Sequence, residues 1–157
     1  MANQDSLTVT RAHFIGIGGA GMSGIALVLH ERGCTVTGSD LKSSRYVREL
    51  EEAGIRVHIG HVAATIDEVR PDVVVTSSAI PETNPEVIRA RELGLPIWPR
   101  AKMLSYLSRG RKTIAVAGTH GKTTTSSMIA TMLDKMDLDP SFLIGGVVEG
   151  YDTKGRN

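Results

Sequence analysis

Short apolar segments alternate with amphipathic segments along most of the chain. The apolar segments have the length and the bounding turn residues of strands, and the amphipathic segments between them have helical spacing. This alternation predicts an α/β protein: a Rossmann-like open parallel sheet with helices on both faces, in strand order 3-2-1-4-5 by analogy. The expected strands are 11–17, 34–38, 55–59, 72–76 and 95–98, and the expected helices run through 25–29, 43–53, 63–69, 85–93 and 101–108.

Turn residues delimit these elements. Glycines at 33, 54 and 94 follow three of the helical patterns, where a left-handed residue ends a helix most easily. Asn84 and Pro85 predict the start of another helix, with Asn as the N-cap and Pro in the first turn. The β-branched run 72–76 is typical of a parallel strand buried on both faces, and Pro96 places the last strand at an edge.

A glycine loop joins the first strand to the first helix. Gly16, Gly18 and Gly21 form G-x-G-x-x-G, and Asp40 ends the second strand 19 residues after Gly21 (40 − 21). In a β-α-β unit this pattern favours a diphosphate at the helix N-terminus and a ribose or base edge at the acid. Any nucleotide diphosphate satisfies it, including a UDP-sugar, so the loop does not by itself indicate NAD.

A second glycine loop covers 117–125 and is the most informative segment of the chain. The apolar run 113–117 precedes it and a helical pattern at 126–136 follows, so strand, glycines, Lys-Thr and helix occur in the order of a P-loop. Lys122 is placed to reach the β- and γ-phosphates, and the Thr123 hydroxyl to bind Mg²⁺. The loop is a shortened version, since Val116 stands where the standard pattern has its first glycine.

Composition excludes several classes of protein. The chain has 157 residues, a net charge of +1, 4% aromatic residues and no basic stripe, which argues against nucleic acid as a partner. Its single cysteine, Cys34, lies in an apolar strand pattern and is interpreted as buried and inert, so a disulfide framework is excluded. Apolar runs are too short for a membrane helix and the N-terminus lacks signal-peptide features, so a cytoplasmic protein without membrane partners is expected.

The domain organisation follows from the same pattern. We expect a Rossmann-like domain that binds a nucleotide diphosphate at 1–108, a polar linker at 109–112, and the truncated start of a P-loop nucleotide-binding domain at 113–157. The last segment holds one strand, one helix and the apolar stretch 141–145, a β-α-β piece that cannot bury a core alone. It should dock on the first domain, pair with another copy, or be partly disordered.

Four motifs together resemble the Mur ligase family. They are GIGGAGMS at 16–23, GSD at 38–40, SSAI at 77–80 followed by NPE at 84–86, and AGTHGKTTT at 117–125. The resemblance covers nearly the whole chain but only about the first third of such an enzyme. It implies ATP-dependent amide synthesis in peptidoglycan precursor formation, in which an acyl phosphate on UDP-N-acetylmuramate is attacked by the amine of L-alanine.

The resemblance also implies site residues. Lys122 is the expected catalytic residue, Thr123 the expected Mg²⁺ ligand, and ATP with Mg²⁺ the expected cofactor pair. His120 is either a phosphate contact or a solvated loop residue, and Arg100 either reaches the substrate or is a surface cation. The expected ATP-binding residues are Gly118, Thr119, His120, Gly121, Lys122, Thr123 and Thr124. The expected UDP-sugar-binding residues are Gly16, Gly18, Gly19, Ala20, Gly21, Met22, Ser23, Asp40, His61, Ser77, Ser78 and Ala79.

Other readings stay open. A sibling ligase that attaches a recycled peptide to UDP-N-acetylmuramate shares these motifs, and a stand-alone UDP-sugar-binding module shares the first loop. A nicotinamide-dependent oxidoreductase is the weakest alternative, because it leaves the second loop unexplained. By the resemblance, the further Mg²⁺ ligands and the remaining central and C-terminal domains lie beyond Asn157, so this chain alone is expected to be inactive as a ligase.

Overall fold

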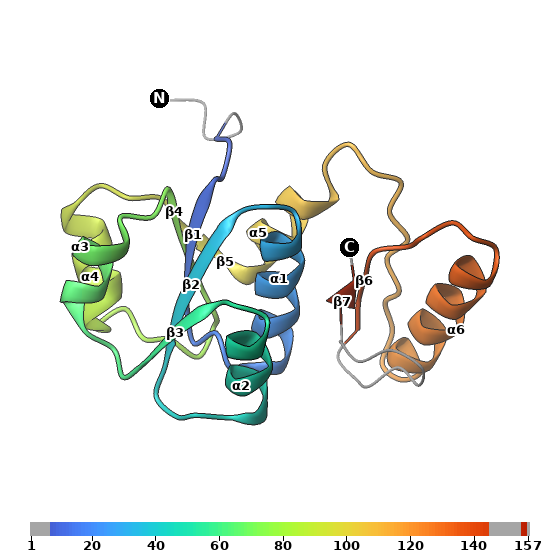
Figure 1. Cartoon of the computed structure of the whole chain (residues 1–157), viewed down its shortest axis with the longest axis horizontal. Coiled ribbons are helices and arrows are strands. Elements are labelled where there is room, and N and C mark those ends of the chain that lie inside the picture. The colour runs from blue at the N-terminus through green and yellow to red at the C-terminus, as the bar shows by residue number, and fades with distance from the viewer. Residues whose placement is uncertain (1–6, 145–154, 157) are drawn as a thin grey trace.

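The computed structural model describes residues 7–144 and 155–156, and its largest part is a five-stranded parallel sheet (Figure 1). The strand order is β3-β2-β1-β4-β5, which confirms the predicted order. Every neighbouring pair is parallel, and β1 at the centre pairs with both β2 and β4. The strands are β1 (Arg11–Ile15), β2 (Thr35–Asp40), β3 (Arg56–Ile59), β4 (Val73–Thr76) and β5 (Ile97–Pro99).

Helices cover both faces of the sheet, as predicted. On one face lie α1 (Ala20–Glu31), α2 (Arg45–Glu52) and α5 (Arg100–Ser108), and on the other lie α3 (Ala63–Val69) and α4 (Pro85–Glu92) (Figure 1). Alternation along the central strand supplies both cores, because successive side chains of a strand point to opposite faces. Ala12 and Phe14 pack in the larger core, whereas Ile15 packs in the smaller one. His13 is also fully buried, and the other buried residues of β1 are apolar.

Local signals set the helix boundaries. Asn84 caps α4, since its side-chain oxygen accepts from the backbone N–H groups of Glu86 (2.9 Å) and Val87 (3.4 Å). Pro85 occupies the first turn, so the predicted start of this helix is confirmed. Glycines 33, 54 and 94 all have positive φ just beyond helix ends, as the sequence predicted.

The segment around the second glycine loop differs from its prediction. The strand expected over 113–117 does not form: residues 112–117 carry neither helix nor strand, and Ile114 is 65% exposed. A strand needs a neighbour to complete its hydrogen bonds, and none of the described strands pairs with this segment. The helix that follows, α6 (Lys122–Lys135), begins at Lys122 instead of the expected Ser126, after Gly121 in the left-handed conformation.

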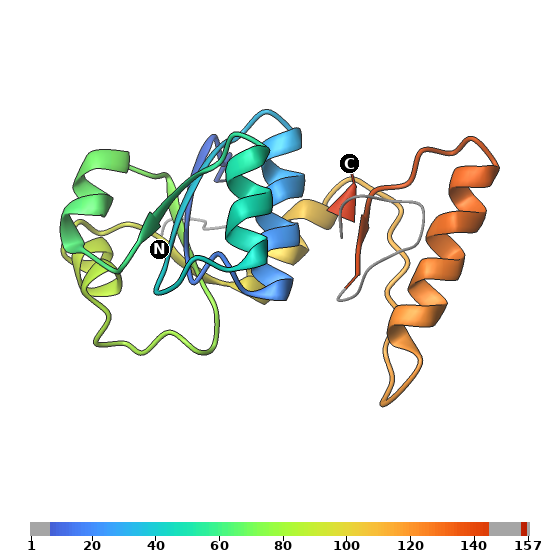
Figure 2. The ribbon, with the colours of Figure 1, turned by 60° about the horizontal axis from the view of Figure 1, so that its bottom comes forward.

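The apolar stretch expected at 141–145 contains the strand β6 (Phe142–Leu143). It pairs antiparallel with β7 (Gly155–Arg156), so the described residues of this segment form a helix and a short antiparallel strand pair in place of the expected β-α-β piece. Leu143 packs against the larger core, and a Cβ on Gly24 of α1 would lie 3.2 Å from its side chain. The C-terminal segment therefore docks on the first domain through β6, and β6 lies between α1 and α6 (Figure 2).

Cys34 departs in part from its prediction. It is half-buried and precedes β2, and its thiol donates to the Val9 carbonyl at 3.3 Å. Burial raises the pKa of this thiol, and the negative charge of Asp72 also raises it. The positive charge of Arg32 lowers the pKa but does not outweigh burial. In the part of the chain that the structure describes, no helix has the length and apolar character needed to span a membrane.

Candidate functional site: two glycine loops and a buried carboxylate

The first glycine loop turns sharply between β1 and α1. The N–H groups of Gly16 and Ile17 both donate to the Ser39 carbonyl, at 2.8 and 3.1 Å, and Gly16 has φ +77°. Helix α1 begins at Ala20 with no side-chain cap. The N–H groups of Ala20 and Gly21 have no acceptor among the described residues, so they are left to water or to an anion, which is the geometry that suits a diphosphate.

Asp40 holds this loop against the end of β2. Its Oδ2 accepts from the Gly18 N–H at 2.9 Å, and its Oδ1 from the Lys42 N–H at 3.3 Å. A Cβ on Gly18 would lie 2.9 Å from that carboxylate and 2.8 Å from Val47, so only glycine fits without a shift of its neighbours. The acid expected to meet a ribose or base thus also fixes the loop.

The loops after β1 and β4 meet at the point where the chain direction switches between sheet halves. A Cβ on Gly16 would lie 3.5 Å from the Ser77 hydroxyl and 3.2 Å from Ile80. Ser78 and Ala79 are exposed beyond them. In open α/β sheets this crevice is where ligands bind, so the structure brings Ser77 to the first glycine loop as the sequence indicated.

Not all predicted residues present their side chains to this crevice. Gly19 and Ala20 are exposed, and Gly21 is half-buried. Met22 is 2% exposed within the larger core, and Ser23 is 7% exposed with its hydroxyl donating to the Ala20 carbonyl at 3.4 Å. Their backbone N–H groups both donate to Gly19 (2.9 Å each), so their evident effect is on the shape of the loop.

Arg100 lies over the start of α1. A Cβ on Gly21 would collide with its guanidinium, and the side chain is exposed with no ion-pair partner among the described residues. The sequence alone allowed two interpretations of Arg100, either a substrate contact or a surface cation. The structure places this cation beside the first glycine loop, along a hollow of about 140 Å³ that Leu104 and Leu143 also line.

A buried polar cluster lies on the α3–α4 side of the sheet, and only one of its four members, His61, was an expected site residue. The Glu86 carboxylate is fully buried and accepts from the Ser39 hydroxyl at 2.5 Å. His61 Nδ1 lies 3.1 Å from the same oxygen, and His13 Nε2 lies 3.5 Å from the other. The only local signal for Glu86 was an acid in the first turn of a helix, which is ordinarily a solvated position.

The second glycine loop leads into α6 with an uncapped N-terminus. Gly118 (φ +154°) and Gly121 (φ +79°) adopt conformations that favour glycine, and α6 has no side-chain cap. Lys122 Nζ donates back to the carbonyls of Gly118 (2.5 Å) and Thr119 (3.2 Å). Open first-turn N–H groups, glycines and an ammonium at the loop fit a phosphate chain, and the Thr123 hydroxyl adds an oxygen ligand suited to Mg²⁺.

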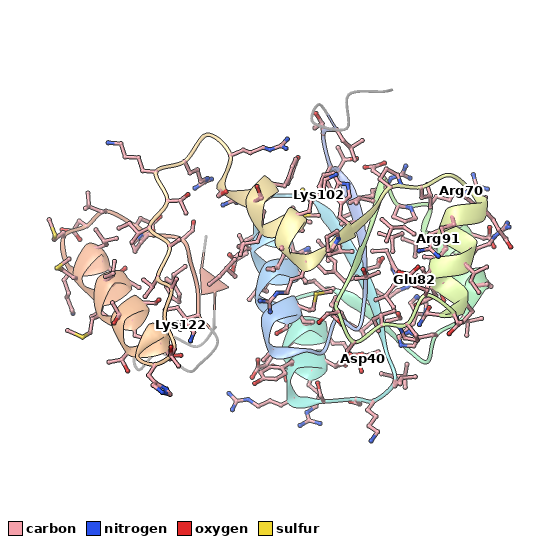
Figure 3. The ribbon with its side chains drawn as sticks, turned by 180° about the vertical axis from the view of Figure 1, so that it is seen from behind. Asp40, Arg70, Glu82, Arg91, Lys102 and Lys122 are labelled. Atoms are coloured by element: carbon pink, nitrogen blue, oxygen red, sulfur yellow. The ribbon has the colours of Figure 1, made fainter. Side chains whose placement is uncertain are left out.

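The two loops belong to different parts of the molecule. Figure 3 shows Asp40 at the end of β2 and Lys122 at the start of α6, well apart across the picture. The residues expected to bind ATP, His120 among them, are all exposed. Among residues 7–144 and 155–156, no three His, Cys, Asp or Glu side chains lie close enough together to hold a metal ion.

The family pattern described as "Mur ligase family, catalytic domain" matches residues 11–112, which include the glycine loop, the Asp40 end of β2 and the whole sheet. The chain belongs to the Mur ligase family. Curated relatives in this family are UDP-N-acetylmuramate–L-alanine ligases. Those of Persephonella marina (51% identity over 148 residues) and Janthinobacterium sp. (55% over 148 residues) each match 94% of this chain. The match covers 32% and 31% of their lengths, so this chain spans about a third of those Mur ligases.

Solved Mur ligase structures have the same fold. A UDP-N-acetylmuramate:L-alanyl-γ-D-glutamyl-meso-diaminopimelate ligase from Neisseria meningitides superposes with a TM-score of 0.88 at 39% identity, covering 95% of this chain and 47% of that one. A UDP-N-acetylmuramate–alanine ligase from Thermotoga maritima gives a TM-score of 0.84 at 33% identity, covering 95% and 36%. The Rossmann-like sheet of this chain is therefore that of the family.

Proposed function

We propose that this chain is the substrate-binding N-terminal part of a cytoplasmic, ATP-dependent ligase that joins L-alanine to UDP-N-acetylmuramate. The observation that carries the proposal is identity of 51–55% to curated L-alanine ligases over 94% of the chain, through both glycine loops. The shared segment includes the loop from Gly16 to Gly21, Ser77 at the sheet crevice and Lys122 at the second loop.

The first domain would hold the UDP part of the substrate. The open N-terminus of α1 suits the diphosphate, since its N–H groups and dipole favour negative charge. Arg100 beside Gly21 adds a positive charge without an ion-pair partner in the described part of the chain. Asp40 at the end of β2 and His61 just after β3 would accept hydrogen bonds from hydroxyl or N–H groups of the nucleoside.

The second loop would hold the phosphates of ATP. Lys122 would exchange its loop carbonyls for phosphate oxygens, Gly118 and Gly121 would allow close approach, and Thr123 would supply one ligand to Mg²⁺. Bound there, ATP would supply the phosphoryl group that activates a carboxylate for attack by an amine. The role of Lys122 is to offset the repulsion between two anions that must approach each other.

A calorimetric titration of the chain with UDP-N-acetylmuramate, UDP and NAD⁺ tests the proposal. Binding of both uridine nucleotides without NAD⁺ is the expected result. Binding of NAD⁺ alone would overturn the proposal and return the first loop to a dinucleotide role. A Gly21→Leu variant is the matched control, because its side chain would displace Arg100 and obstruct the helix N-terminus while the sheet stays unchanged.

The second candidate is the ligase that attaches a recycled peptide. It is favoured by one observation, the TM-score of 0.88 to the Neisseria enzyme of that name. In the same comparison the L-alanine ligase from Thermotoga scores 0.84, so the fold of this part does not separate the two. Assay of the full-length enzyme with L-alanine and with the tripeptide separates them, and the proposal expects product from L-alanine alone.

A further inference from the structure

Polar side chains from four elements meet beneath the carboxyl edge of the sheet. His13 comes from β1, Ser39 from β2, His61 from the turn after β3 and Glu86 from the first turn of α4. Glu86, His13 and Ser39 are fully buried, and the His61 side chain is 9% exposed. Burying a carboxylate this completely is costly unless charges or donors surround it, so the arrangement calls for a role beyond packing.

The contacts of Glu86 determine which ring nitrogen of His61 carries the proton. The Ser39 hydroxyl donates to Glu86 Oε2 at 2.5 Å, so its oxygen faces His61 Nδ1 at 3.0 Å as an acceptor. The same nitrogen lies 3.1 Å from Glu86 Oε2. An unprotonated Nδ1 would face two acceptors, whereas a protonated one donates to them. Neutral His61 therefore carries its proton on Nδ1, and its Nε2 is an acceptor.

His13 supports the carboxylate from its other side. Its Nδ1 lies 2.9 Å from the Thr37 hydroxyl and its Nε2 lies 3.5 Å from Glu86 Oε1, and neither Nε2 nor Oε1 makes a hydrogen bond in the described part of the chain. Burial alone would raise the pKa of Glu86. The adjacent His13 ring, the hydrogen bond from Ser39 and the His61 ring outweigh burial and hold that pKa below its ordinary value. Glu86 is therefore an ionised and strong acceptor.

The free nitrogen of His61 faces outward near the first glycine loop. Its Nε2 has no partner among the described residues and is not one of their fully enclosed unsatisfied atoms. His61 directly follows Gly60, whose N–H donates to the Asp40 carbonyl at 2.7 Å. His61 is thus anchored at the same sheet edge as the acid that holds the glycine loop.

We propose that Glu86, supported by His13, is a positioning residue that fixes the Nδ1-protonated tautomer of His61, so that Nε2 accepts a hydrogen bond from a hydroxyl or N–H group of the UDP-sugar. This inference rests on the proposed function in that the sugar nucleotide is the ligand. The tautomer itself is a property of the unliganded chain. The two parts can therefore be tested apart.

Proton–nitrogen correlation spectra of the histidine side chains test the first part. They are recorded at about pH 8, where unperturbed imidazoles are neutral, and His61 is assigned by its loss in His61→Asn. The expected spectrum has protonated Nδ1 and bare Nε2. Glu86→Leu should transfer the proton to Nε2, because Ser39 then donates to Nδ1. Ser39→Ala is the matched control: it removes the other neighbour of Nδ1 and should leave the tautomer unchanged.

Titration with UDP-N-acetylmuramate tests the second part. Glu86→Leu and His61→Asn should each raise the Kd about tenfold, a loss typical of one hydrogen bond. Glu86→Gln, which retains an acceptor oxygen, should raise the Kd less than Glu86→Leu does. His61→Asn keeps a donor near the Nδ1 position and loses the Nε2 acceptor, so it separates the two nitrogens even if Glu86→Leu does not fold.

The outcomes distinguish the two proposals. A wild-type spectrum with protonated Nε2 overturns the positioning role, whatever the ligand. Unchanged affinity in His61→Asn overturns the binding role of Nε2. Failure of the wild-type chain to bind any uridine nucleotide overturns the proposed function, while the spectra still decide the tautomer.

Discussion

The backbone N–H of Gly18 donates to the Asp40 carboxylate at 2.9 Å, so the end of β2 holds the glycine loop that follows β1. An acid at this position is usually considered as a ligand for a ribose. Here it is already engaged by the loop and by the Lys42 N–H. The carboxylate is therefore part of the structure of the loop before any nucleotide binds.

Substitution of Asp40 should separate these two roles. Asp40→Ala leaves the Gly18 N–H without its acceptor, and we expect the Kd for UDP to rise about tenfold or more, equivalent to about 1.4 kcal/mol. Asp40→Asn keeps an acceptor oxygen and should lose less. Calorimetry measures both, with Glu51→Gln on the exposed surface of α2 as the control. Equal losses in Ala and Asn would assign the effect to charge instead of loop support.

Replacement by alanine should destabilise the chain at both Gly38 and Gly33, but for different physical reasons. A Cβ on Gly38 would lie 2.5 Å from Ile17 and 2.8 Å from the Phe14 carbonyl, so Gly38→Ala forces the centre of the sheet apart. We expect it to lower the free energy of unfolding by about 1–3 kcal/mol. Gly33 has open space around it but φ +85°, so Gly33→Ala should cost about 1 kcal/mol through backbone strain alone. Urea unfolding at pH 7 compares them, and a larger loss at Gly33 would contradict the argument.

Because of Asp72, the free energy of unfolding should decrease at acid pH. Its Oδ2 accepts from the Thr10 hydroxyl (2.6 Å) and from the N–H groups of Thr10 (3.0 Å) and Arg11 (2.8 Å). Burial alone would raise its pKa, but these hydrogen bonds outweigh burial and hold the pKa below the ordinary 3.8. A depressed pKa means that the stabilisation is present above the ordinary value and is lost as pH falls through the folded-state value.

Asp72→Asn should therefore be less stable than the wild type at pH 7, by about 1–3 kcal/mol for hydrogen bonds to a charged group. The difference should shrink as the pH falls below about 4, because Asp72 of the unfolded chain takes up a proton there before Asp72 of the folded chain does. Urea unfolding of both proteins at pH 7 and pH 3 measures it. A difference that stays constant across this range would show that charge is not involved.

Cys34 should react slowly with thiol reagents. Because burial raises the pKa of its thiol above the ordinary 9.0, little thiolate is present near neutral pH. We expect a rate at pH 7 well below that of the urea-unfolded chain, rising steeply above pH 9. Spectrophotometric thiol titration follows both. Folded and unfolded chains reacting at one rate at pH 7 would contradict the assignment.

Lys122 tests the second loop in the full-length enzyme. Lys122→Met removes the ammonium that now contacts the Gly118 carbonyl, and turnover should fall at least about a hundredfold, as for loss of one transition-state donor. The KM for the UDP-sugar should change little, since that substrate is proposed to bind the other loop. Lys112→Met, an exposed cation before the loop, is the control. If Lys122→Met mainly weakened UDP-sugar binding, Lys122 would belong to the UDP-sugar site and its proposed role at the ATP phosphates would be wrong.

The structural features that depend on residues close together in the chain were predicted from the sequence. Alternating apolar runs with glycine ends predicted the five strands, and Asn84 with Pro85 predicted the start of α4. The strand order came from analogy with other open α/β sheets, and the approach of Ser77 to the first glycine loop was implied by the family resemblance. Periodicity and turn chemistry are local properties, so one sequence suffices to read them.

The sequence did not predict what depends on distant partners. Residues 113–117 have strand composition but form none, because hydrogen bonds from neighbouring strands decide whether such a run pairs. Glu86 resembled an ordinary solvated acid, and its three partners are distant in sequence. Only the packing of α4 against the sheet brings them together.

The central position of β1 has a consequence for the order of assembly. Arg11 to Ile15 pair on one side with residues 35–39, and Ala12 to Ile15 pair on the other side with 73–76. During synthesis β1 can therefore close only part of its hydrogen bonds until β4 has left the ribosome. In that interval the growing chain exposes an open edge on its central strand, so translation speed between codons 40 and 76 should influence how much of it aggregates.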